Sequence, residues 1–303
     1  MKTISFIVNK NWETEPFLNA LTNPELKPSK LPFPDVLNSP KKGDNKMYTE
    51  RAVFRLTDGT NPSLEVRVWC IQDLMYLDEK PDPAKQSSSS SEEKYKRLKT
   101  LFSDHKSDLV IAVGTAGYPS ETSFNGSIVI GGNFFVHNGD ANNDVSRLNV
   151  EGIGKMLPLN ANKKIFDLVN KEFKGIVESK FLHTPRNPAQ PAVCMASKVF
   201  TAVSSVNVTD YTKYNWVDHE AIEHYKSIEG QLPFNSLETT HGVIRLAGDN
   251  PIIFMSAITD RLGYFDTEVN AVQNYVASFN AGIVAAQLII SLNEFVVAGN
   301  SLG

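Results

Sequence analysis

Apolar residues along the chain follow two spacings in turn. Short apolar runs, some alternating with polar residues, predict strands, and apolar residues three or four positions apart predict helices between them. The predicted strands are residues 4–8, 51–56, 64–71, 108–113, 126–136, 192–208 and 252–258, and the predicted helices are residues 13–21, 92–102, 161–174, 218–228, 239–247 and 270–297. Because strands alternate with helices, we expect an α/β fold with three layers.

Two stretches interrupt this alternation. Residues 22–48 are rich in proline among lysines and asparagines, which predicts an irregular excursion over the surface. Residues 78–91, DEKPDPAKQSSSSS, are too poor in apolar groups to repay the cost of ordering, so we expect a mobile loop there.

Composition narrows the class of protein. With 303 residues, 41% of them hydrophobic, and a net charge of −4, the chain is typical of a globular protein and is not expected to bind nucleic acid broadly. Cys70 and Cys194 lie far apart without histidines at ligand spacing, so neither a disulfide framework nor a metal site is expected. No signal peptide is evident and no run approaches a membrane span, so we expect a cytoplasmic protein that does not bind membranes.

The strand at 108–113 leads directly into Gly114, Thr115, Ala116 and Gly117. Glycines at both ends of this tetrapeptide would let a backbone loop approach a phosphate, a carboxylate or a sugar hydroxyl. The alternative is a plain tight turn. The tetrapeptide is neither a P-loop nor a dinucleotide fingerprint.

Two carboxylates flank a predicted helix and strand in residues 236–260. If the helix begins beside Glu238 and runs back along the sheet, the strand returns and delivers Asp260 to the same edge. In open α/β sheets, ligands bind at the edge formed by the carboxyl ends of the strands. The alternative is that Glu238 caps a helix and Asp260 starts a loop.

Aromatic residues cluster after the strand at 192–208. Tyr211, Tyr214 and Trp216 would be able to stack on a flat ring, or would form a peripheral packing cluster. His137, at a strand end, is expected to be an ordinary polar residue.

Several of these stretches together resemble the nucleoside phosphorylase and nucleosidase superfamily. That family has a strand leading into a Gly-Ser/Thr-Ala-Gly loop, a Met-Glu pair before a helix, and a strand that ends in Ser-Asp. The counterparts here are Gly114 to Gly117, Leu237 with Glu238, and Thr259 with Asp260, in the same order. The resemblance covers roughly residues 108–140 and 203–297.

The resemblance implies a single nucleoside phosphorylase-like domain over residues 1–303, a three-layer α/β/α fold with a central mixed sheet, and a nucleoside cleft. Glu238 would accept hydrogen bonds from the ribose hydroxyls. Asp260 would protonate N7 of the leaving purine or donate a hydrogen bond to it. The sugar or nucleophile would lie along the Gly114 to Gly117 segment, Leu237 would line the pocket, and Tyr211 would stack on the base.

The departures from the family favour hydrolysis. Its phosphorolytic members have an N-terminal phosphate loop and an arginine before the glycine loop, whereas Ala112 and Val113 precede Gly114 here. The nucleosidases use water and an N-terminal glutamate, for which Glu13 is the best positional match and Glu15 the rival.

We therefore expect an enzyme that cleaves the N-glycosidic bond of a purine nucleoside or thio-nucleoside by hydrolysis. The alternatives are a phosphorylase that uses phosphate as co-substrate, a member that binds a nucleoside without cleaving it, and an unrelated α/β protein with chance motifs. No cofactor is expected, the partner is a small-molecule nucleoside, and the resemblance suggests a homo-oligomer.

Overall fold

The computed structural model describes residues 1–39, 49–75, 91–119, 124–137, 148, 150–184, 190–195, 198–202 and 236–303. Within these residues, twelve strands form one mixed sheet. The strands are β1 Lys2–Val8, β2 Val36–Leu37, β3 Ala52–Asp58, β4 Asn61–Cys70, β5 Leu109–Tyr118, β6 Ile128–Gly131, β7 Asn133–His137, β8 Met156–Leu157, β9 Val193–Met195, β10 Lys198–Ala202, β11 Leu237–Glu238 and β12 Ile252–Arg261. The α-helices are α1 Asn11–Thr22, α2 Ile71–Leu74, α3 Ser91–Asp104, α4 Lys171–Glu178, α6 His241–Leu246, α7 Phe265–Glu268 and α8 Ala271–Val297.

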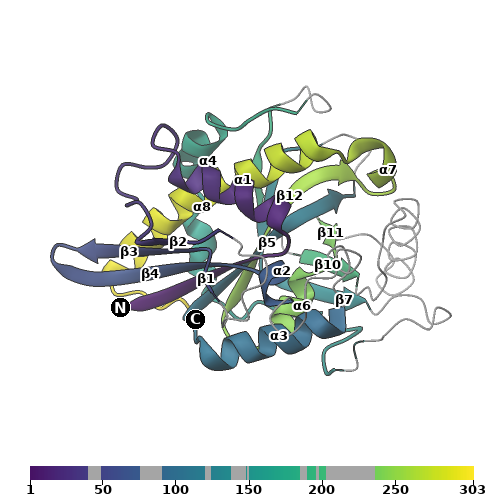
Figure 1. The fold of residues 1–303 in the computed structure, drawn as a ribbon, viewed down its shortest axis with the longest axis horizontal. Helices are drawn as coiled ribbons and strands as arrows, with labels where there is room; N and C mark the ends of the chain where they lie inside the picture. The colour runs from purple at the N-terminus through teal and green to yellow at the C-terminus, as the bar shows by residue number, and fades with distance from the viewer. Residues whose placement is uncertain are drawn as a thin grey trace.

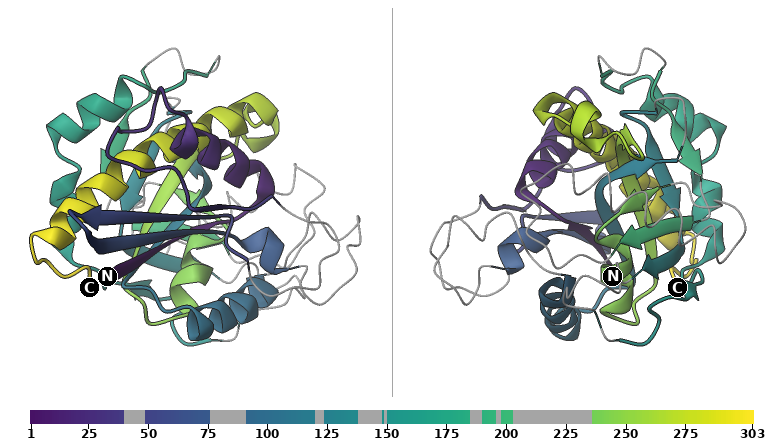
Figure 2. Two further views of the ribbon diagram at one scale, coloured as in Figure 1. Left: turned by 60° about the vertical axis from the view of Figure 1, so that its left-hand side comes forward. Right: turned by 90° about the vertical axis from the view of Figure 1, so that its right-hand side faces the viewer.

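Strand β5 is the branch point of the sheet. One path runs β2-β3-β4-β1-β5-β11-β10-β7-β8, and a second leaves β5 through β12 to β6 and β9. Helices α1, α4 and α8 cover one face, and α3 and α6 cover the other (Figure 1). The two further views in Figure 2 also place α3 on the side of the sheet opposite α1 and α8.

The alternation of side chains on β5 explains why both faces are covered. Leu109, Ile111 and Val113 belong to the apolar cluster beneath α1 and α8, whereas Val110 and Ala112 belong to the cluster above α3 and α6. A strand that is apolar on both faces must be covered on both. The predicted three-layer fold with a mixed sheet is confirmed.

Helix α8 is the main support of one layer. Its side-chain cap is Asn270, whose Oδ1 accepts a hydrogen bond from the amide of Gln273 at 2.9 Å. Contrary to expectation, α8 is long and apolar enough to cross a membrane by length and composition, but 83% of its most apolar window is buried in the protein. Such burial is typical of a core helix.

Several other predictions change in detail. The predicted strands 51–56 and 64–71 correspond to β3 and β4, which pair antiparallel as a hairpin, and residues 126–136 contain two strands, β6 and β7. The predicted helix 161–174 is wrong, because a 3₁₀ helix Lys163–Leu168 ends before Asn170, whose side chain caps the separate helix α4. The 22–48 excursion contains β2, which pairs with β3. The predicted helix 218–228 lies outside the described residues.

Candidate active site

The segment Gly114 to Gly117 is part of a strand. The predicted loop is wrong, because the backbone of β5 continues to pair with β12, with Gly114 beside Ser256 and Gly117 beside Asp260. Glycine tolerates an extended backbone as readily as a turn, so the sequence did not distinguish the two. The glycines here allow side chains from other elements to approach the strand.

On the side of β5 opposite β12, two strands pair with β5 one after the other and leave a gap between them. Strand β1 ends at Val8, which pairs with Val113, and β11 begins with Leu237, which pairs with Gly117. The carboxylate of Glu13 lies in this gap. Its Oε1 accepts hydrogen bonds from the amide of Thr115 at 2.7 Å and from the Thr115 hydroxyl at 2.8 Å.

Helix α1 fixes the position of Glu13. The second carboxylate oxygen, Oε2, accepts a hydrogen bond from the amide of Lys10 at 2.7 Å, so Glu13 closes the first turn of the helix as in a capping box. Burial raises the pKa of Glu13, and the hydrogen bonds from Thr115 and Lys10 together with the charge of Lys10 partly offset the rise. The result is a desolvated carboxylate, which is a stronger base than one in water.

The rival carboxylate, Glu15, points elsewhere. Its side chain is 59% exposed, and its Oε1 lies 3.7 Å from Nη1 of Arg51. Of the two N-terminal glutamates, the structure places Glu13 against the Gly114 to Gly117 segment.

Asp260 lies against the far end of the same segment. The residue is 2% exposed, and its Oδ1 accepts a hydrogen bond from the hydroxyl of Thr259 at 2.7 Å. A Cβ added to Gly117 would lie 3.2 Å from Oδ2 of Asp260, so glycine permits the close approach. Strand β12 extends through Asp260 to Arg261, three residues beyond the predicted end at Ile258.

Leu237 and Glu238 lie at the same end of β5 as Asp260 but on the other side of the strand. Leu237 pairs with Gly117, and Glu238 follows it at the end of β11. The expectation that Glu238 and Asp260 lie at one edge of the sheet is therefore confirmed by the pairing on both sides of Gly117.

Oε2 of Glu238 turns towards the start of α6. It accepts hydrogen bonds from the amide of Thr240 and, at 2.7 Å, from the amide of His241. This is the capping role that the sequence left open as the alternative.

Two residues of this region were missed by sequence reasoning, His241 and Lys94. Both are buried, with 0% and 4% of the residue exposed. Lys94 lies in the first turn of α3, and its Nζ donates a hydrogen bond to the hydroxyl of Thr240 at 3.0 Å. Its spacing from Leu98 and Phe102, four and eight positions on, puts it on the buried face and was the available signal.

Burial, with a smaller contribution from the charge of Lys10, lowers the pKa of Lys94 to about 7, although the charges of Glu238 and Glu13 oppose the shift. In the unfolded chain, Lys94 remains protonated up to the ordinary lysine range. The unfolded state therefore binds the extra proton between about pH 7 and pH 10, so the contribution of Lys94 to stability increases as the pH rises through that window.

This pH dependence is testable with Lys94→Met. The free energy of unfolding of the wild type, relative to that of the variant, is expected to increase by on the order of 2 kcal/mol from pH 7 to pH 9. Urea denaturation at both pH values measures it. Lys96→Met is the matched control, since Lys96 lies on the same helix with its side chain 61% exposed. Equal pH dependence in wild type and Lys94→Met would contradict the assignment.

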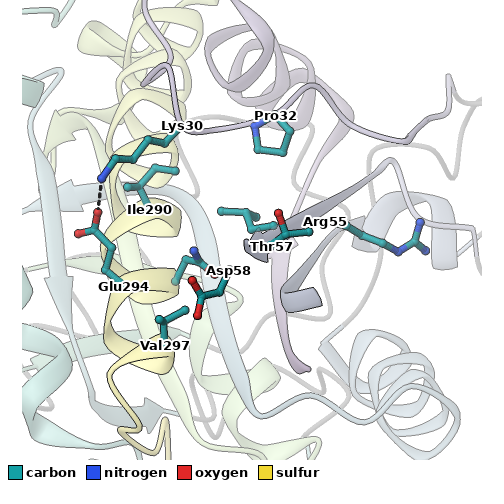
Figure 3. A pocket seen from close by; sticks show the side chains of 10 residues that line it. Lys30, Pro32, Arg55, Thr57, Asp58, Ile290, Glu294 and Val297 are labelled. Atoms are coloured by element: carbon teal, nitrogen blue, oxygen red, sulfur yellow. Dashed lines mark hydrogen bonds and ion pairs between the residues drawn. The ribbon is translucent and has the colours of Figure 1, made fainter. Parts of the chain in front are cut away.

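One pocket of the described residues lies away from these side chains. It has a volume of about 430 Å³ and is lined by β3, the loop at Lys30 and Pro32, and the last turns of α8, with the ion pair between Lys30 and Glu294 on one wall (Figure 3). It lies at the hairpin end of β4, near the amino end of β1. Because ligands of open α/β sheets bind at the carboxyl ends, the Glu13 region is the better candidate site.

The predicted stacking residue Tyr211 lies outside the described residues, as do Tyr214 and Trp216. Among the described residues, no group of three or more His, Cys, Asp or Glu side chains is arranged to hold a metal ion.

The mixed sheet between two helical layers is a fold that this chain shares with several solved nucleosidase structures. One structure that shares it is the 5'-methylthioadenosine/S-adenosylhomocysteine nucleosidase from Neisseria meningitidis in complex with methylthio-immucillin-A, with a TM-score of 0.54, 12% identity, and coverage of 95% of this chain and 99% of that chain. The 5'-methylthioadenosine nucleosidase of Arabidopsis thaliana is similar with a TM-score of 0.54, 13% identity, and coverage of 99% and 98%. The futalosine hydrolase of Helicobacter pylori is similar with a TM-score of 0.54, 10% identity, and coverage of 95% and 98%.

No protein-family model matches the sequence, and no curated protein matches it. At these identities the similarity defines the fold, and the chemistry must be argued from the residues of the site.

Proposed function

We propose that this protein hydrolyses the N-glycosidic bond of a purine nucleoside or thio-nucleoside. In this proposal Asp260 protonates the leaving base, which stabilises the charge that develops as the bond breaks. Glu13 activates the attacking water. Glu238 and Leu237, which lie beside Gly117, bind the sugar, and Tyr211 stacks on the base.

The observation that carries the proposal is the carboxylate of Glu13 in the gap between β1 and β11. A buried carboxylate held by Thr115 and Lys10 is fixed in position and has a raised pKa, which suits a general base near neutral pH. It shares one end of β5 with Asp260, which lies against Gly117.

The two lysines near Glu13 favour water over phosphate as the nucleophile. Lys10 and Lys94 interact with Glu13, and burial lowers the pKa of both lysines. A site for phosphate requires a lasting positive charge, preferably the planar fork of arginine. A lysine that loses its proton near pH 7 is a poor substitute.

The test is incubation with adenosine, inosine, methylthioadenosine, S-adenosylhomocysteine and futalosine, with and without phosphate. We expect free base and a sugar with a free 1-hydroxyl from at least one of them, at the same rate without phosphate. A rate that depends on phosphate, with a sugar 1-phosphate as product, would contradict hydrolysis and support the phosphorylase.

A second candidate is a protein that binds a nucleoside without cleaving it. The observation in its favour is that Oε2 of Glu238 is already engaged by the amides of Thr240 and His241. Binding measured by calorimetry without any product from the same nucleosides would support this candidate.

A further inference from the structure

His241 is a fully buried histidine that the proposed roles leave unused. Its ring stacks on Phe254, with centroids 6.0 Å apart, and its Nδ1 lies 3.4 Å from the hydroxyl of Ser256. The Ser256 hydroxyl lies 2.9 Å from that of Ser236. Nε2 has no hydrogen-bond partner among the described residues, although it is buried. A buried polar atom without a partner is costly, and a bound water at this nitrogen would remove that cost.

The unpartnered nitrogen points at Gly114. A Cβ added to Gly114 would lie 3.3 Å from Nε2 of His241 and 3.6 Å from Oε1 of Glu13. Glycine therefore leaves a small space on β5 that a histidine nitrogen and a carboxylate oxygen both border. Asn9, whose Oδ1 is also unpartnered in the described part of the chain, has its Cβ 4.0 Å from the same point.

The surroundings make His241 a neutral donor. Burial lowers its pKa, while the charge of Glu238 opposes the shift. With the ring neutral, one nitrogen carries a hydrogen and the other accepts. Oε1 of Glu13 across the space favours the hydrogen on Nε2, because two acceptors facing each other would repel, and the Ser256 hydroxyl then donates to Nδ1.

We propose that His241 and Glu13 together hold the nucleophilic water of the hydrolysis over Gly114. The Nε2 hydrogen of His241 donates to the water oxygen, and Oε1 of Glu13 accepts one of the water protons. Held this way, the water keeps a lone pair free to attack the sugar. The inference rests on the proposed function and adds His241 as a catalytic residue that contacts the reacting water.

The proton and electron balance is complete. The water oxygen forms a bond to the anomeric carbon of the sugar, and a water proton passes to Glu13. The bond from that carbon to the base nitrogen breaks, its electron pair leaves with the base, and the base takes a proton from Asp260. The sum is the addition of one water, and no other reactant is needed. Transfer of a proton from Glu13 back to Asp260 through solvent restores both carboxyl groups.

Two substitutions separate this role from simple packing. His241→Phe keeps a planar ring against Phe254 but removes the donor, and we expect kcat to fall at least about 10-fold with KM changed less than about twofold. His241→Gln keeps an N–H donor near the position of Nε2, and we expect it to retain kcat within about fivefold. A residue that only packs would show the opposite order, since phenylalanine fills the buried space better than glutamine.

The control and a second variant keep the test decisive. His105→Gln is the matched control, because His105 contacts Trp69 and Arg67 on the α3 side, and its kcat is expected to be unchanged. Gly114→Ala places a methyl group in the water space, so it is expected to lower kcat at least about 10-fold even if His241→Phe fails to fold. Thermal denaturation establishes that each variant compared is folded.

The outcomes distinguish this inference from the proposed function. If the wild type releases base and folded His241→Phe is equally active, or if Gly114→Ala is fully active, the role of His241 is refuted and the hydrolysis stands. If the wild type releases base from none of the nucleosides, the proposed function and the role of His241 fall together.

Discussion

Asp260→Asn is expected to lower kcat for base release by about 100-fold to 10,000-fold, the usual contribution of a positioned general acid. Asparagine has nearly the same shape and can still accept the hydrogen bond from the Thr259 hydroxyl, so the fold is expected to persist. It has no acidic proton to give to the leaving base. Steady-state kinetics and thermal denaturation of the purified variant measure the two effects separately.

Asp58→Asn is the control for this substitution. Asp58 is exposed at the end of β3 and lines the pocket between β3 and α8, away from Gly117. Its replacement is expected to leave kcat unchanged. Full activity in folded Asp260→Asn would eliminate Asp260 as the acid.

Glu13→Gln is expected to lower kcat by a similar factor, about 100-fold to 10,000-fold, because an amide cannot accept the water proton. The amide oxygen can still accept from Thr115, but its NH₂ group would face the amide of Lys10, where two donors oppose each other. We therefore also expect a loss of stability of about 1–3 kcal/mol, measured by urea denaturation.

The pH profile provides a sharper readout for Glu13. A general base works in its ionised form, so kcat/KM of the wild type is expected to fall on the acid side, at a pH above the usual range of glutamate because burial raises the pKa of Glu13. The residual activity of Glu13→Gln is expected to lack that acid limb. Glu15→Gln, which changes an exposed glutamate two positions further along α1, is expected to keep both the wild-type rate and the acid limb of the pH profile. An unchanged acid limb in Glu13→Gln would show that another residue is the general base.

The choice between Glu13 and Glu15 illustrates what a single sequence leaves open. The two residues are two positions apart in one helix, so they point in different directions, but helical periodicity alone does not say which direction faces the sheet's edge. Only the packing of α1 settles that Glu13 contacts Thr115 while Glu15 reaches Arg51.

Lys94 and His241 were missed for a different reason. Amphipathic patterns assign charged residues to the solvent side, and Lys94 breaks that rule by its burial. His241 is the first residue of a short helix whose neighbours in space, Gly114, Ser256 and Phe254, come from distant parts of the sequence. The helical spacing of Lys94 indicates its burial, but no local pattern of either residue indicates which groups it contacts.

The sequence by itself determined the alternation of strands and helices, the three-layer class, and the pair of acids that reach one end of the sheet. These depend on periodicity and chain order, which are local properties. The tertiary structure decided that Gly114 to Gly117 is a strand, that Glu13 fills the gap between β1 and β11, and that His241 faces it across Gly114. These features depend on which strand lies beside which and where each one ends, and such long-range pairing is set by the packing of the whole chain.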